Sequence, residues 1–483
     1  MAAVKIVAAS TLPIPVIWGD AILYLIRAHN LALLGQPVID NLHAPDYPPL
    51  YSFLIAPVYL FSSRSADADF WVLTGNALLC SAMLLPAYRL HLLISGKKAA
   101  AVTAALAVAS LPARWRWSLT VPAENLSMPL LLVTVPVVWH AARSEQSYGL
   151  WLLAGFLIGA LLLTKALPAA VVPAMVVGGS GLLVRAWRQR RRRLAVSCLL
   201  LGLGFVLPLL AWRVVYLLSL PAWRFPLDWR GAYEPARYLE TRWSALTDPV
   251  AGPFLLQTLF RQFALLQFYT FGLAGVGLAG LVVLSLRPGR YRFVSFCCLL
   301  GVGGVLAVAA LHCVAYYPTA PEKYAVFGRS ADSAAPLLVT LGAARLFRME
   351  VRREAILWIW LPAAAAAAQA LPWSSRYLIY QPDIEWLQNL LDLIPFRLLA
   401  YGATALMAAT FLLWRRRFVR TLGTMASALG LSGVGTAPVV QTYRGSQWID
   451  QHFPAAHYTL WSTSFRIRTA GLPLRKTFPP GSA

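Results

Sequence analysis

Charged side chains, and acidic ones above all, are scarce in this sequence. Only 19 of the 483 residues are aspartate or glutamate, and charged residues of both signs together make up 13%. Hydrophobic residues make up 59%, and the mean hydropathy is +0.61. A water-soluble protein of this length needs more polar surface than these residues supply. The composition therefore excludes a water-soluble enzyme and indicates an integral membrane protein.

Cysteine is also sparse, and its five positions all fall in apolar stretches. They show neither the Cys-x-x-Cys spacing nor the Cys/His spacing that is typical of metal sites. We therefore expect reduced core thiols, no disulfide framework and no metal-ligand cluster among Cys80, Cys198, Cys297, Cys298 and Cys313.

Basic residues outnumber acidic ones by 42 to 19, which gives a net charge of +23. In a soluble chain such an excess would suggest nucleic-acid binding. In a membrane protein, lysine and arginine instead orient the helices, because cytoplasmic loops retain them. We expect membrane lipids as surroundings and no nucleic-acid partner.

Apolar runs that are suited to cross a bilayer as helices recur along the chain. They predict an all-α polytopic membrane protein with about 13 transmembrane helices, near residues 4–18, 70–93, 99–111, 119–140, 150–163, 167–184, 194–220, 263–286, 293–316, 335–347, 355–371, 398–414 and 422–440. The first run also fits a cleaved signal sequence. Short arginine-rich connections follow every second span, which places them in the cytoplasm.

The remaining connections are longer, more polar and rich in aromatic residues, so this threading places them outside. Long polar loops usually carry function. We therefore expect one transmembrane domain over residues 1–440, whose first outer loop, residues 20–69, contains juxtamembrane helices. Residues 441–483 form a short outer tail, and the chemistry lies on the outer face.

The first outer loop begins with Asp20, where the first span leaves the membrane. If the loop starts as a helix, Asp20, Tyr24 and Arg27 share one face and present a base, a hydroxyl and a cation together. The alternative is that Asp20 only caps an interfacial helix. The same loop offers further polar candidates for a substrate pocket, namely His43, Asp46 and Tyr47.

A short apolar segment follows, opened by Tyr47, Pro48 and Pro49 and ended by Ser62. It is too short to span, and prolines suit a helix start better than a helix interior. We expect this segment to lie in the outer interface.

Two further charged residues stand at outer helix ends. Glu124 opens the fourth span, where the helix macrodipole alone would favour a carboxylate. Lys165 ends the fifth span, where it either snorkels to the interface or helps to bind an anionic lipid headgroup. Arg114, Arg116 and Arg329 are cations on the same face.

At these residues the sequence resembles the GT-C glycosyltransferases of the protein-mannosyltransferase and aminoarabinose-transferase type. The resemblance rests on Asp20, on Glu124, and on three segments, YPPLYSFLIAPVYLF, LAGFLIGALLLTK and YAVFGRSADSAAPLL. It implies a polytopic enzyme of the plasma (inner) membrane that takes a sugar from a polyprenyl-phosphate co-substrate and passes it to a hydroxyl acceptor in the cell envelope.

The resemblance also implies roles for the candidates. Asp20 would be the general base that deprotonates the acceptor hydroxyl, while Lys165, Arg329 and Arg27 would stabilise the departing lipid phosphate. One base and direct displacement would invert the anomeric centre. No cofactor other than the lipid-linked sugar is required, although a divalent cation between a carboxylate and the phosphate stays open. The alternatives are a multi-pass transporter and a lipid-linked glycan ligase or polymerase.

Overall fold

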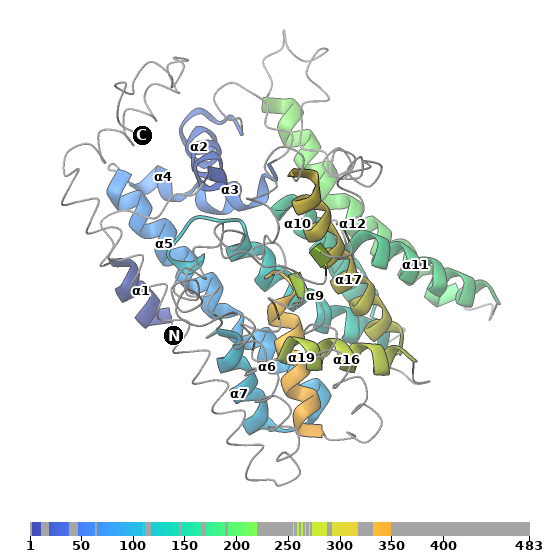
Figure 1. The fold of residues 1–483 in the computed structure, drawn as a ribbon. Coiled ribbons are helices and arrows are strands. Elements are labelled where there is room, and N and C mark those ends of the chain that lie inside the picture. The colour runs from blue at the N-terminus through green and yellow to red at the C-terminus, as the bar shows by residue number, and fades with distance from the viewer. Residues whose placement is uncertain are drawn as a thin grey trace.

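The computed structural model describes residues 2–10, 19–37, 47–62, 65–109, 111, 117–143, 147–165, 171–188, 192–219, 273–286, 292–316 and 332–348, and single positions between 255 and 270. Within these ranges the elements are helices and there are no strands, so the all-α prediction is confirmed (Figure 1). The last three predicted spans and the tail, residues 441–483, lie outside the described residues.

Fourteen helices have assigned bounds in this part of the chain. They are α1 (Ala2–Ser10), α2 (Gly19–Leu34), α3 (Leu50–Ile55), α4 (Val58–Phe61), α5 (Ser65–Ala82), α6 (Leu84–Ser95), α7 (Lys98–Ala109), α9 (Glu124–Arg143), α10 (Tyr148–Thr164), α11 (Val171–Arg188), α12 (Arg192–Ser219), α16 (Leu273–Leu286), α17 (Arg292–Tyr316) and α19 (Ala335–Arg348).

Several of these helices are suited to a bilayer. Four described stretches are long and apolar enough to cross it, at Asp67–Ser95, Glu124–Arg143, Arg192–Leu218 and Arg292–Leu311. Six shorter apolar helices accompany them. A helix pairs its own backbone amides and carbonyls, which is the requirement that hydrocarbon imposes. The chain is thus a multi-pass membrane protein, and the number of thirteen spans stays a prediction.

Two helix boundaries differ from the prediction. The span near residues 70–93 is divided at Met83, between α5 and α6, because Pro86 has no N–H group to donate to the carbonyl oxygen of Ala82. The fourth span was predicted to start at residue 119, but α9 starts at Glu124. The five residues before it form an irregular segment, in which the carbonyl oxygen of Thr120 accepts hydrogen bonds from Asn76 on α5 and from Asn125 on α9.

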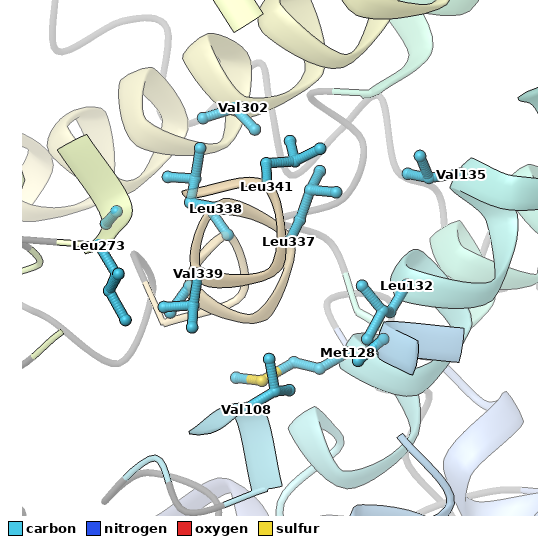
Figure 2. Close-up of a cluster of buried hydrophobic side chains, with 14 of the residues drawn as sticks. Val108, Met128, Leu132, Val135, Leu273, Val302, Leu337, Leu338, Val339 and Leu341 are labelled. Carbon is cyan, nitrogen blue, oxygen red and sulfur yellow. The ribbon is translucent and has the colours of Figure 1, made fainter. Parts of the chain in front are cut away.

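The main core surrounds α19. Figure 2 shows Leu337, Leu338, Val339 and Leu341 of α19 at the centre of the cluster. Side chains of α7, α9, α16 and α17 converge on them: Val108, Met128, Leu132, Leu273 and Val302. Lipid is as apolar as leucine, so close van der Waals packing, rather than removal from water, holds such helices together.

Glycines bring two pairs of helices into backbone contact. A methyl group added at Gly155 of α10 would lie 2.0 Å from the carbonyl oxygen of Leu201 in α12. One added at Gly277 of α16 would lie 2.1 Å from the carbonyl oxygen of Leu338 in α19. Only glycine permits such an approach, and small residues at helix interfaces serve this purpose in membranes.

One end of the helix assembly is covered by the short helices α2, α3 and α4 (Figure 1). Helix α3 begins directly after Pro48 and Pro49, so the prediction that these prolines start a helix is confirmed. The elements α2, α3, α5, α9 and α10 carry the polar residues of the next section. Contacts of α3 with both α2 and α10 tie this end of the assembly together.

Candidate active site

Helix α2 presents a buried cation. The Arg27 side chain is only 2% exposed, and its Nη1 donates a hydrogen bond of 2.6 Å to the carbonyl oxygen of Tyr47. Burial lowers the pKa of Arg27 from 12.5 to about 10, because removing the guanidinium from water disfavours its charged form. Arg27 therefore remains a cation at neutral pH.

Three tyrosine rings form the wall beside this cation. The ring of Tyr24 meets the ring of Tyr47 edge-on with centroids 6.2 Å apart. It meets the ring of Tyr51, on α3, in the same manner at 5.6 Å. Edge-to-face pairs of this kind each contribute about 1 kcal/mol beyond their buried area. The contacts fix the segment before α3 against α2.

The hydroxyl group of Tyr51 starts a buried hydrogen-bond network. It donates to Oδ1 of Asn76 on α5 at 2.8 Å, and Nδ2 of Asn76 donates to the carbonyl oxygen of Thr120 at 2.8 Å. Nδ2 of Asn125 donates to the carbonyl oxygen of Trp117 at 2.7 Å. Burial raises the pKa of Tyr51 well above its ordinary value, so the phenol stays protonated and able to donate. The network holds the irregular segment before α9 in one conformation.

An ion pair stands where α9 begins and α10 ends. Glu124 is the first residue of α9 and fully buried, while Lys165 follows the last residue of α10 and leaves the helix in an extended conformation. The Lys165 ammonium group bonds Oε1 of Glu124. The macrodipole favours a carboxylate at a helix start and a cation at a helix end. Consecutive helices that pack side by side bring these two ends together across 41 residues of sequence.

Tyr51 connects the buried cation of α2 with the ion pair. Its ring packs on Tyr24, and its hydroxyl lies within electrostatic reach of Glu124. We call the set of Tyr24, Arg27, Tyr47, Tyr51, Glu124 and Lys165 the polar cluster. It combines two cations, one carboxylate and three phenols, a set suited to hold an anion and hydroxyl groups next to each other.

The structure assembles five of the nine predicted site residues in this cluster: Tyr24, Arg27, Tyr47, Glu124 and Lys165. Asp20 lies in the first turn of α2, one turn before Tyr24, and its side chain is not among the described ones. His43, Asp46 and Arg329 lie outside the described residues, as do Arg114 and Arg116. The roles of all these residues stay predictions.

The sequence reasoning missed Asn76 and Asn125. Both asparagines are fully buried, in helices whose residues are mostly apolar. A polar side chain within an apolar span is a signal in itself, because it must find a partner there. Within the described part of the chain, no group of three or more histidine, cysteine or acidic residues is placed to hold a metal ion.

Comparison with known proteins bears on the family and the fold of the chain. Residues 46–212 match the family described as dolichyl-phosphate-mannose-protein mannosyltransferase. This range includes Tyr47, Tyr51, Asn76, Glu124 and Lys165. No curated protein matched the sequence.

Two solved structures resemble the fold. The crystal structure of ArnT from Cupriavidus metallidurans bound to undecaprenyl phosphate aligns with a TM-score of 0.50 and 16% identity, covering 91% of this chain and 76% of that one. The apo state of the same protein aligns with a TM-score of 0.46 and 15% identity, covering 90% and 76%. At 16% identity, the first of these similarities supports a shared fold and nothing more specific.

Proposed function

We propose that the chain is a membrane glycosyltransferase with the GT-C fold, which transfers a sugar from a polyprenyl-phosphate donor to a hydroxyl acceptor at the outer face of the plasma membrane. The observation that carries the proposal is the polar cluster, in which buried Arg27 and the Lys165–Glu124 pair flank one tyrosine wall. The solved relative binds undecaprenyl phosphate, which supports this class of donor.

The donor phosphate is an anion that must meet cations at the edge of the bilayer. In the proposal Lys165 and Arg27, together with Arg329, bind it. The ammonium group of Lys165 has three N–H donors. The bond to Glu124 uses one of them, and in the proposal the ammonium group bonds a phosphate oxygen as well. In a site of low dielectric these charges stabilise the leaving phosphate far better than they would in water.

Asp20 takes the proton. The acceptor oxygen forms a bond to the anomeric carbon while the bond from that carbon to the phosphate oxygen breaks, and the acceptor proton passes to the Asp20 carboxylate. The lipid phosphate leaves with the electron pair. A single displacement of this kind inverts the anomeric centre. Asp20 is one helical turn from Tyr24, so its backbone is already beside the cluster.

The remaining candidates complete the pocket. Tyr24 and Tyr47 supply phenol groups, and His43 and Asp46 lie in the loop that leads to α3. In this proposal they bind hydroxyl groups of the sugar or the acceptor.

The experiment is a transfer assay with the purified chain in nanodiscs. The protein receives a radiolabelled polyprenyl-phosphate sugar and a cell-envelope extract, with and without a chelator to test for a divalent cation. We expect release of lipid phosphate together with label in an acceptor. Movement of an unmodified solute into proteoliposomes, without loss of the donor, would instead identify a transporter. Transfer of whole glycan chains would identify a ligase or polymerase.

A further inference from the structure

Two buried asparagines meet at one backbone carbonyl in front of α9. Asn76 of α5 and Asn125 of α9 are both fully buried. Nδ2 of Asn76 donates to the carbonyl oxygen of Thr120 at 2.8 Å, and Nδ2 of Asn125 donates to the same oxygen at 3.3 Å. Nδ2 of Asn125 also donates to the carbonyl oxygen of Trp117 at 2.7 Å. Side chains of two different helices therefore hold the segment of residues 117–120.

Each asparagine uses its side-chain oxygen as well. Oδ1 of Asn76 accepts from the hydroxyl of Tyr51 at 2.8 Å. Oδ1 of Asn125 accepts from the thiol of Cys80 at 3.1 Å. Both amide groups thus form hydrogen bonds with both of their polar atoms. A buried network whose members are all satisfied stabilises one arrangement of its parts, and this network joins α3, α5 and α9.

The ion pair lies within the part of the chain that the network holds. Glu124 stands between Thr120 and Asn125, so its backbone is fixed on both sides. The Glu124 carboxylate bonds the ammonium group of Lys165. The place of this cation therefore depends on the place of the start of α9.

The other end of the network leads to the second cation. The ring of Tyr51 packs on the ring of Tyr24, and that ring packs on Tyr47. The carbonyl oxygen of Tyr47 accepts the hydrogen bond from Arg27. The Asn76 side chain bonds both parts of the site, with Oδ1 toward Tyr51 and Nδ2 toward the segment before α9.

We propose that Asn76 is a positioning residue for glycosyl transfer, which fixes Lys165 relative to Arg27 so that both cations meet the leaving phosphate. The inference rests on the proposed function and deepens it, and Asn76 itself does not touch the donor. The phosphate gains negative charge as its bond to the sugar breaks, so the placement of the cations matters most in the transition state. A displacement of about 1 Å at such a site costs about 10²-fold in rate.

Three variants separate this role from a structural one. Asn76→Leu leaves the phenol of Tyr51 buried without its acceptor, and Tyr51→Phe leaves Oδ1 of Asn76 without its donor, so both should melt below the wild type. The double variant removes both partners, while the carbonyl oxygen of Thr120 keeps its bond from Asn125. Replacing both members of a buried hydrogen bond by apolar groups of similar shape is nearly neutral. The double variant should therefore recover most of the melting temperature that each single variant loses.

The rate of transfer should not recover. Transfer is measured in nanodiscs with increasing polyprenyl-phosphate sugar and a cell-envelope extract as acceptor, on the monodisperse fraction of each variant. We expect all three variants to lose about tenfold or more in kcat and equally in kcat/KM, as for an interaction made in the transition state. Thr134→Val is the matched control, because it removes a buried hydrogen bond of 2.7 Å within α9 that lies outside the network. It should keep the wild-type kcat.

A purely structural role predicts that the rate follows the melting temperature. A double variant that regains the wild-type kcat would therefore overturn the inference, and so would Asn76→Leu with the wild-type kcat. A double variant that melts no higher than the single variants, or a Thr134→Val variant that loses as much kcat as Asn76→Leu, would overturn it too. Wild-type protein that transfers no sugar would contradict the proposed function and the positioning role with it, whereas results confined to the variants decide on Asn76 alone.

Discussion

Removing Lys165 should destabilise the chain more than removing its partner. Glu124 is fully buried, whereas the Lys165 side chain is 15% exposed. In Lys165→Met the carboxylate of Glu124 stays buried without its cation, and breaking a buried pair from one side costs about 3–5 kcal/mol. The exposure of Lys165 lets some water reach the pair, so we expect about 3 kcal/mol. In Glu124→Gln the amide can still accept a bond and the ammonium group can turn toward water, so the loss should be about 1 kcal/mol.

A double-mutant cycle measures this asymmetry. The unfolding of wild type, Lys165→Met, Glu124→Gln and the double variant is followed by tryptophan fluorescence in one detergent. The double variant buries no charge at this position, so it should be more stable than Lys165→Met alone, with a coupling energy of about 2 kcal/mol. A coupling energy near zero, or a Lys165→Met variant as stable as the wild type, would refute the argument that Glu124 depends on this cation.

Three other predictions use separate features of the chain. Gly155→Ala should lower the melting temperature, because the added methyl group forces α10 away from α12. Gly149→Ala on the same helix should not, because nothing lies within 4 Å of a methyl group added there. Equal effects of the two substitutions would contradict the close contact between α10 and α12. Arg27 should keep its charge between pH 6 and 8.5, so its ionisation should not change donor binding in this range. Donor binding should weaken as the pH rises through about 10, where Arg27 loses its charge. A pH titration of donor binding in wild type and in Arg27→Gln checks this. In a cysteine-free variant, a cysteine introduced by Gln189→Cys should react with a thiol label only from the cytoplasmic side, and one introduced by Ser446→Cys only from outside. Labelling of both cysteines from the same side would contradict the predicted threading of the chain.

The helices and most of their ends could be predicted from the sequence, whereas the break at Met83 and the start of α9 could not. An apolar run near bilayer length has one stable conformation in lipid, so the runs near residues 150–163 and 293–316 predicted α10 and α17 closely. The turn at Met83 leaves no trace in hydropathy, because apolar residues continue through it. The start of α9 at Glu124 depends on bonds that Asn76 and Asn125 make to the backbone of residues 117–120. Such bonds arise between helices and have no local signature.

The same distinction applies to the candidate site. Charged residues at helix ends could be recognised one at a time, since a charge at the membrane edge needs a partner or a role. Their pairing could not be predicted: Lys165 was expected either to snorkel to the interface or to bind a phosphate, and its bond to Glu124 follows from the packing of α9 against α10. The contact of Arg27 with the backbone of Tyr47 likewise depends on how the loop returns to α2.

The central claim is that Asp20 deprotonates the acceptor. Its most direct test is single-turnover transfer from a polyprenyl-phosphate sugar by Asp20→Asn, with the exposed Asp67→Asn as the matched control. We expect Asp20→Asn to bind the donor and fold as the wild type does while its transfer rate falls by about 10²-fold or more, as for loss of a general base. Asp67→Asn should keep the full rate. Wild-type transfer by Asp20→Asn would contradict the account.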